Sequence, residues 1–121
     1  MARRGKYGAR QVRVAGHLFR SQWERDRYQQ LELLQAAGEI SELSYDPPKF
    51  TLHDAYTCRR TGKRVKASTY EPDFFYLDKR GAPVYEDAKG TKRRESVLKR
   101  KIVEARHGVI IWFSYRDGRM E

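Results

Sequence analysis

The pattern of apolar and polar positions predicts a first helix near the start of the chain. Residues 22–37 carry apolar side chains at helical spacing, after Ser21, which forms a capping box with Glu24, and before Gly38, which suits a left-handed helix end. Its expected apolar face consists of Trp23, Leu31 and Leu34, with Tyr28 alongside. Because a helix has 3.6 residues per turn, Glu24 projects into this face, so its carboxylate is either a helix cap or a site ligand.

A second helix is predicted over residues 92–107, with Gly108 as its stop. Its expected apolar face consists of Leu98, Ile102 and Ala105. Residues 109–115 are almost continuously apolar, which is typical of a strand buried on both faces of a sheet. Residues 116–121 are expected to fray into solvent.

Shorter strands are expected elsewhere in the chain. Residues 11–14 alternate in polarity, and a turn is expected at 15–17. Short extended segments are predicted between residues 40 and 52, where Phe50 and Leu52 point inward.

A hairpin carrying acids in apolar surroundings is predicted in the middle of the chain. Residues 70–77 and 83–90 flank a turn at 78–81. Alternation along each strand places Asp73 on one face with Phe75 and Leu77, and Asp87 on one face with Tyr85 and Lys89. The two carboxylates and the ammonium group can then converge across adjacent strands.

Such a cluster needs a physical reason, because buried charges are costly unless they are paired or bind metal. Asp73 and Asp87 could bind Mg²⁺, which favours one or two carboxylates together with phosphate and water. The plain alternative is a salt bridge between Asp87 and Lys89 at a strand end. Glu86 points to the opposite strand face from Asp87 and is a structural or secondary candidate.

Composition favours a polyanionic partner. The 121 residues contain 26 Lys and Arg against 16 Asp and Glu, a formal net charge of +10. Nucleic acid is favoured over an anionic membrane surface, because the chain shows no transmembrane run, signal peptide or long basic amphipathic helix near a terminus. A single cysteine, Cys58, fits a reducing compartment, and we expect a cytoplasmic protein.

The cations concentrate in three segments that are candidates for nucleic-acid contact. Residues 1–10 are expected to form a basic arm, a turn-like tip lies within residues 53–69, and a third cluster lies in the first turn of the second helix. The candidate contacts are Arg3, Arg4, Lys6, Arg10, Arg59, Arg60, Lys63, Arg64, Lys92, Arg93 and Arg94. The alternative for each segment is a solvated surface that touches no partner.

Several of these motifs resemble those of a nuclease superfamily. Pro72-Asp73, followed by Asp87-Ala88-Lys89, resembles the PD-(D/E)xK signature of metal-dependent nucleases. The similarity extends to small phage and prophage endonucleases related to phage Holliday junction resolvases of the endonuclease I type. It is also carried by Lys6–Arg10, by Phe19–Glu24 with Arg27-Tyr28, by Glu86–Gly90 and by Lys101–Gly108.

The resemblance implies an α/β fold with a restriction-endonuclease-like core, a mixed sheet flanked by helices in the order α-β-β-β-α-β, as the local pattern also indicates. Residues 11–121 would form one nuclease domain after the basic arm. Asp73, Asp87 and Glu24 would be the Mg²⁺ ligands, with Mn²⁺ as a substitute, and Lys89 would orient water and neutralise charge.

The resemblance also implies a partner and an assembly. The expected activity is endonucleolytic cleavage of DNA, selective for branched structures such as a Holliday junction, by a homodimer in phage DNA processing. Two alternatives stay open: a noncatalytic nucleic-acid-binding factor and a sequence-specific endonuclease of the homing or restriction type.

Overall fold

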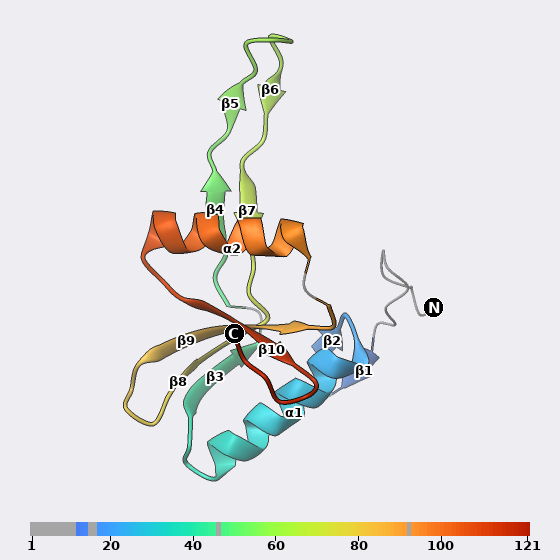
Figure 1. Cartoon of the computed structure of the whole chain (residues 1–121), viewed down its shortest axis with the longest axis vertical. Coiled ribbons are helices and arrows are strands. Elements are labelled where there is room, and N and C mark those ends of the chain that lie inside the picture. Colours follow the sequence, from blue (N-terminus) through green and yellow to red (C-terminus); the bar gives the residue numbers. More distant parts are fainter. Residues whose placement is uncertain (1–11, 15–16, 46, 92) are drawn as a thin grey trace.

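The computed structural model describes residues 12–14, 17–45, 47–91 and 93–121, and side chains from residue 19 onward within these ranges (Figure 1). The predicted basic arm, with Arg3, Arg4, Lys6 and Arg10, lies outside the described residues, as does Lys92. In the part that is described, no helix is long and apolar enough to cross a membrane.

A four-stranded mixed sheet forms the centre of the fold (Figure 1). Its strands are β3 (Ser41–Tyr45), β8 (Phe74–Leu77), β9 (Pro83–Lys89) and β10 (Ile111–Tyr115), in the order β10-β9-β8-β3. β8 pairs antiparallel with both β3 and β9, whereas β10 pairs parallel with β9. The predicted mixed sheet is therefore confirmed.

Two helices cover opposite faces of this sheet, α1 (Gln22–Ala36) on one side and α2 (Arg94–His107) on the other (Figure 1). The α1 side is filled by a cluster of Phe19, Leu31, Ile40, Phe74 and Tyr76. The α2 side is filled by Tyr70, Val103, Ile111, Phe113 and Tyr115. The chain order α1, β3, β8, β9, α2, β10 gives the predicted α/β architecture.

Helix α1 begins and ends where the sequence predicts. The Ser21 hydroxyl accepts a hydrogen bond from the Glu24 backbone N–H at 3.1 Å, and Gly38 adopts a φ of 78° just after the helix. Leu34 was expected on the apolar face, but it is 37% exposed. The core on this side takes only Leu31 from the second half of the helix.

The buried face of α2 differs from the prediction. Val103 is fully buried, whereas Leu98 is 59% exposed and Ala105 is exposed. Arg100 explains the difference, because its guanidinium stacks 3.9 Å from the centre of the Phe113 ring and donates a hydrogen bond to the Glu121 carbonyl. The hydrophobic pattern counts Arg100 as a polar, outward-facing residue. It therefore places the inward face of α2 one residue away from the observed face.

The end of the chain is ordered against β10, contrary to the predicted fraying. The Phe113 N–H donates to the Glu121 carbonyl at 2.8 Å, and the Tyr115 N–H donates to the Arg119 carbonyl at 2.9 Å. β10 is therefore an edge strand that the following residues cover. Trp112 is 37% exposed, so the prediction of a strand buried on both faces is also wrong.

Outside the central sheet, the described residues form two hairpins. β1 (Val12–Val14) pairs antiparallel with β2 (His17–Phe19), so His17 lies in a strand and not in the expected turn. The longer hairpin has two paired sections, β4 (Phe50–His53) with β7 (Ser68–Tyr70), and β5 (Tyr56–Thr57) with β6 (Arg64–Val65). We call residues 50–70 the ribbon, which projects from the body of the molecule past α2 (Figure 1).

Candidate functional site

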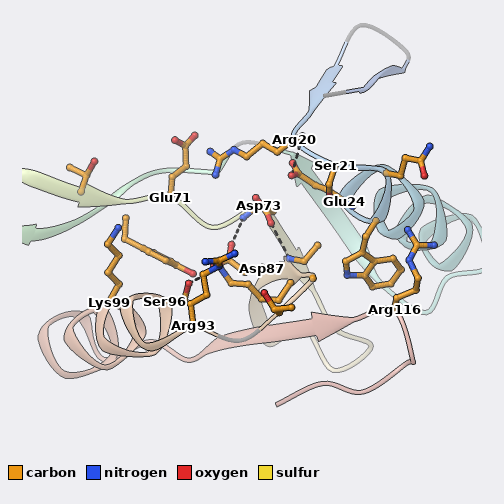
Figure 2. A pocket seen from close by; sticks show the side chains of 18 residues that line it. Arg20, Ser21, Glu24, Glu71, Asp73, Asp87, Arg93, Ser96, Lys99 and Arg116 are labelled. Carbon is orange, nitrogen blue, oxygen red and sulfur yellow. Dashed lines mark hydrogen bonds and ion pairs between the residues drawn. The ribbon is translucent and has the colours of Figure 1, made fainter. Parts of the chain in front are cut away.

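A cavity of about 940 Å³ opens where the start of α1, the base of the ribbon, the end of β9 and the start of α2 meet (Figure 2). All four predicted catalytic residues line it: Glu24, Asp73, Asp87 and Lys89. The cavity is also lined by Arg20, Tyr70, Glu71, Arg93, Ser96, Lys99 and Arg116. The structure thus brings the predicted acids and lysine to one place.

Asp73 and Asp87 face each other across the ends of β8 and β9. The Asp73 backbone N–H donates to Asp87 Oδ1 at 2.9 Å, and the Ala88 N–H donates to Asp73 Oδ2 at 2.9 Å. These reciprocal bonds hold both carboxylates on the same side of the sheet, as the strand alternation predicts. They use one oxygen of each carboxylate and leave the second for another partner.

Glu24 joins this pair from the first turn of α1 and is only 3% exposed. Its Oε1 accepts from the Tyr45 hydroxyl at 3.0 Å, and its Oε2 accepts from the Arg20 backbone N–H at 3.3 Å. The capping interpretation is therefore correct in part, since the carboxylate reaches back to Arg20 and not to Ser21. The same carboxylate also lines the cavity, so capping does not remove it from the site.

Burial raises the free-energy cost of ionising all three acids. Burial, followed by the charge of Asp73, raises the pKa of Glu24 to about 7. Burial also raises the pKa of Asp73 to about 6, against the opposing effect of the Arg20 charge. Burial likewise raises the pKa of Asp87, although Lys89 lowers it. A cation placed between these buried carboxylates would stabilise their ionised forms.

Lys89 provides one cation at this site. Its Nζ lies 3.7 Å from Asp87 Oδ2 and 3.5 Å from Ser96 Oγ, and it sits over the Phe113 ring at 5.0 Å. The alternative salt bridge with Asp87 is thus present, but it is long. Ser96 and Phe113 fix the lysine beside both acids, where its ammonium group can also meet a bound anion.

Arg20 is a functional candidate that the sequence analysis missed. Figure 2 shows it extending from the start of α1 across the cavity toward Glu71. Its guanidinium interacts electrostatically with Asp73, Glu24 and Glu71. Its signals in the sequence are weak, namely its position directly before the cap residue Ser21 and its place in the segment Phe19–Glu24, and the facing acids come from more distant segments.

Tyr70 was also missed. It lines the cavity from the end of the ribbon and is 7% exposed, yet its hydroxyl has no hydrogen-bond partner among the described residues. A buried hydroxyl normally has a partner. The group is therefore available to a water molecule or a ligand, and no local sequence pattern identifies it.

The predicted nucleic-acid contacts divide among several places. Arg93 lines the cavity, and Arg94 lies by a second hollow of about 400 Å³ together with Leu98 and Lys101. The four predicted contacts in the ribbon are exposed at or near its tip and do not reach the acids: Arg59, Arg60, Lys63 and Arg64.

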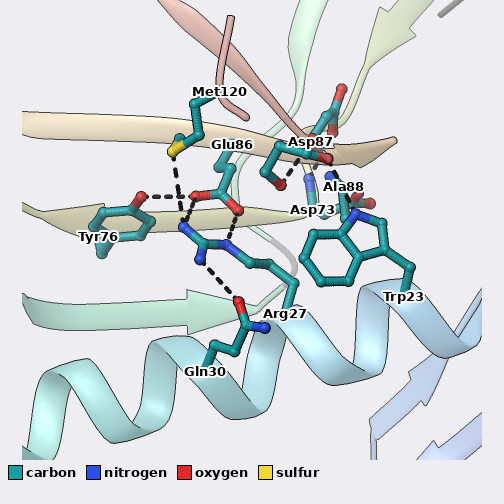
Figure 3. A network of polar contacts seen from close by, with 10 residues as sticks. Trp23, Arg27, Gln30, Asp73, Tyr76, Glu86, Asp87, Ala88 and Met120 are labelled. Carbon is teal, nitrogen blue, oxygen red and sulfur yellow. Dashed lines mark hydrogen bonds and ion pairs between the residues drawn. The ribbon is translucent and has the colours of Figure 1, made fainter. Parts of the chain in front are cut away.

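Glu86 has a structural role on the other face of the sheet (Figure 3). It is fully buried and accepts hydrogen bonds from Arg27 Nε at 2.6 Å and Arg27 Nη2 at 3.0 Å. The Tyr76 hydroxyl donates to it at 2.7 Å. Glu86 therefore pairs α1 with the sheet and does not face the cavity.

The donor set limits what kind of metal could bind. Among the described residues, no group of three or more His, Cys, Asp and Glu side chains is placed to hold an ion. Glu24, Asp73 and Asp87 thus line one cavity without forming a closed three-ligand cage. The Asp73 and Asp87 pair still fits Mg²⁺, which is commonly held by one or two carboxylates, with waters and substrate phosphates completing its shell.

The comparisons with known proteins define a family but not an activity. The chain belongs to the family described as "Protein of unknown function (DUF1064)", which it matches over residues 4–120. No curated protein and no solved structure matches the chain.

The raised pKa of Glu24 predicts a pH dependence of folding stability in the presence of a chelator. The carboxyl group titrates near 4.5 in an unfolded chain and near 7 in the folded protein. Between these values the folded state binds more protons, so this group's contribution to stability falls as the pH rises. From about pH 5 to about pH 8, we expect the parent to lose stability relative to Glu24→Gln in urea denaturation.

The matched control for this measurement is Glu32→Gln, an exposed acid on the same helix. Its stability should follow the parent across the pH range. If the free energy of unfolding changes with pH in the same way for the parent and Glu24→Gln, the prediction that Glu24 has a raised pKa is wrong.

Proposed function

We propose that this protein is a divalent-metal-dependent endonuclease that hydrolyses DNA phosphodiester bonds. The observation that carries the proposal is the reciprocal pairing of Asp73 and Asp87, two desolvated carboxylates on adjacent strand ends beside Lys89. The element order and the parallel pairing of β9 with β10 agree with a restriction-endonuclease-like core. The resemblance to PD-(D/E)xK nucleases points to the same residues.

In this mechanism, Asp73 and Asp87 would hold the metal ion, with Glu24 acting on it directly or through water. The bound ion supplies Lewis-acid polarisation of a phosphoryl oxygen. Lys89 orients the attacking water and places positive charge beside the scissile phosphate. Its position next to Asp87 supports orientation and electrostatics more directly than proton abstraction.

The remaining cavity side chains would hold the DNA backbone on either side of the cut. Arg93, directly before α2, and Lys99 within it face Arg20 and Glu71 across the cavity (Figure 2). These cations can neutralise flanking phosphates without entering the core. The Tyr70 hydroxyl, which lacks a partner among the described residues, can donate to a phosphate oxygen or to an ordered water.

The proposed substrate is branched DNA, cut by a homodimer, and this part of the proposal depends on the resemblance to junction resolvases. A noncatalytic DNA-binding factor is the second candidate. It is favoured by the lack of a three-acid metal cage among the described residues.

The test is a cleavage and binding assay with labelled duplex, single-stranded and four-way-junction DNA. We expect the parent to cut DNA with Mg²⁺ or Mn²⁺, to prefer the junction, and to stop cutting when EDTA is added. If the protein binds DNA but does not cut it with either metal, the noncatalytic DNA-binding function is supported instead. Discrete cuts in one duplex sequence would instead indicate a sequence-specific enzyme.

A further inference from the structure

The ribbon begins at the wall of the cavity and ends far from it. At the base of the ribbon, Phe50 of β4 lies opposite Tyr70 of β7 in the strand pairing, and Tyr70 lines the cavity. Its tip is closed by a turn in which the Cys58 N–H donates to the Lys63 carbonyl at 2.8 Å and the Gly62 N–H donates to the Cys58 carbonyl at 2.7 Å. At about 3.3 Å per residue, the strand from position 70 to position 62 spans roughly 26 Å.

The base of the ribbon is fixed to the body of the protein. The Phe50 ring packs 5.1 Å from the rings of both Tyr85 and His107. A ring nitrogen of His107 lies 2.8 Å from the Thr51 carbonyl oxygen, and Arg106 pairs with Asp54 at 3.1 Å. The direction of the ribbon is therefore set by β9 and α2.

The outer half of the ribbon has no core of its own. We call residues 55–67 the outer half; Tyr56 is 49% exposed, and all of these residues except Cys58 and Val65 are exposed. A two-stranded hairpin without a covering layer gains little stability by itself. Folding of the domain therefore does not explain this projection, whereas a partner lying along it would.

The charge of the outer half indicates which partner this is. Residues 55–67 contain five cations and no acid: Arg59, Arg60, Lys63, Arg64 and Lys66. None of the five forms an ion pair with a carboxylate among the described residues. All five are exposed, so they can meet phosphates at little desolvation cost.

The cavity itself leads toward the ribbon. At the end away from Glu24 and Arg116, its walls are Glu71 at the ribbon base and Lys99 on α2 (Figure 2). A nucleic-acid backbone held at Asp73 and Asp87 can leave through this end, beside β7. It would then continue along the cationic side of the molecule.

We propose that the ribbon grips the same DNA duplex that is cut, at a fixed distance from the scissile phosphate, so that cleavage requires duplex on that side. At about 3.4 Å per base pair, a reach of 26 Å corresponds to roughly eight base pairs. This inference depends on the proposed nuclease function and adds a minimum length for the bound arm. The tip contacts are to phosphates, so the requirement concerns length and not sequence.

The experiment compares substrates that differ only in the duplex length on one side of the mapped cut, about four against about twelve base pairs. We expect the parent to cut the longer substrate at least about tenfold faster. Arg59→Ala/Arg60→Ala should slow cleavage of the long substrate more than that of the short one, and so remove most of this advantage. The variant should also lower the slope of log affinity against log salt by about two for the long duplex.

The matched control is Lys79→Ala/Arg80→Ala, which removes two cations from another exposed hairpin turn, outside the cavity. It should keep the parental dependence on length. The inference is overturned if the parent shows no length dependence, if both variants behave alike, or if Arg59→Ala/Arg60→Ala slows both substrates equally. If the ribbon variant binds and cuts DNA as the parent does, the ribbon does not contact the DNA and the inference is also overturned.

Failure of the nuclease proposal has a different signature. If the parent cuts no substrate, anisotropy measurements in EDTA still compare its affinity for the two duplex lengths and for both variants. If the parent prefers the long duplex and only the ribbon variant loses this preference, the inference that the ribbon binds the duplex is supported. Equal affinities of the parent for both lengths would overturn that inference.

Discussion

Asp87→Asn should reduce DNA cleavage by at least about a hundredfold, because it removes a charged ligand from the proposed metal site. The folded protein should not lose stability. The amide oxygen can still accept the bond from the Asp73 N–H, and the variant removes a buried carboxylate whose pKa is raised by burial. Single-turnover cleavage in Mg²⁺ and urea denaturation measure the two effects.

Asp117→Asn is the control, since this exposed acid lies outside the cavity. It should cut DNA at the parental rate. Asp73→Asn should behave like Asp87→Asn, because each carboxylate contributes one side of the pair. Undiminished cleavage by both site variants would refute the metal-site assignment, while lost cleavage together with unfolding would show that the pair is structural.

Arg27→Met should lower the free energy of unfolding by about 3–5 kcal/mol, because it leaves the fully buried Glu86 carboxylate without its charged partner. The Tyr76 hydroxyl would be the remaining hydrogen-bond donor to that carboxylate. A loss of this size is a large part of the stability of a small domain. Urea denaturation at neutral pH measures it.

Arg25→Met is the matched control on the same helix. Arg25 pairs with Asp26 at 2.8 Å, but both side chains are about one-third exposed, so the expected loss is below about 1 kcal/mol. Adding Glu86→Gln to Arg27→Met should recover part of the lost stability by removing the unpaired charge. If the double variant is no more stable than Arg27→Met, the loss reflects packing of the arginine stem and not the buried charge.

Local pattern was sufficient to predict the elements that position the acids. The cap at Ser21 and the strand alternation around Asp73 and Asp87 depend on neighbouring residues, and the structure confirms the helix and the convergence. Glu24 was also placed correctly on the inward face of α1. These features could be predicted because helical and strand periodicity act over only a few residues.

Other features depend on contacts between distant segments and could not be predicted in this way. Arg20 belongs to the site only because Asp73 and Glu71 fold against it. Arg100 is on the inward side of α2 because Phe113 and Glu121 receive its guanidinium, which moved the apolar face of the helix. The Tyr70 hydroxyl lacks a hydrogen-bond partner within the described part of the chain, and sequence spacing carries no such information.

The return of residues 119–121 onto β10 restricts how two copies of the chain can associate. Those residues already occupy backbone groups at one border of the central sheet. At the opposite border, the Leu43 N–H of β3 is taken by the Gln35 side chain at 2.8 Å. A twofold assembly that extends this sheet from one subunit into the next would have to displace such contacts. The homodimer expected of a junction-cutting enzyme would therefore associate through other surfaces, such as the outer side of α1, where Leu33 is 72% exposed.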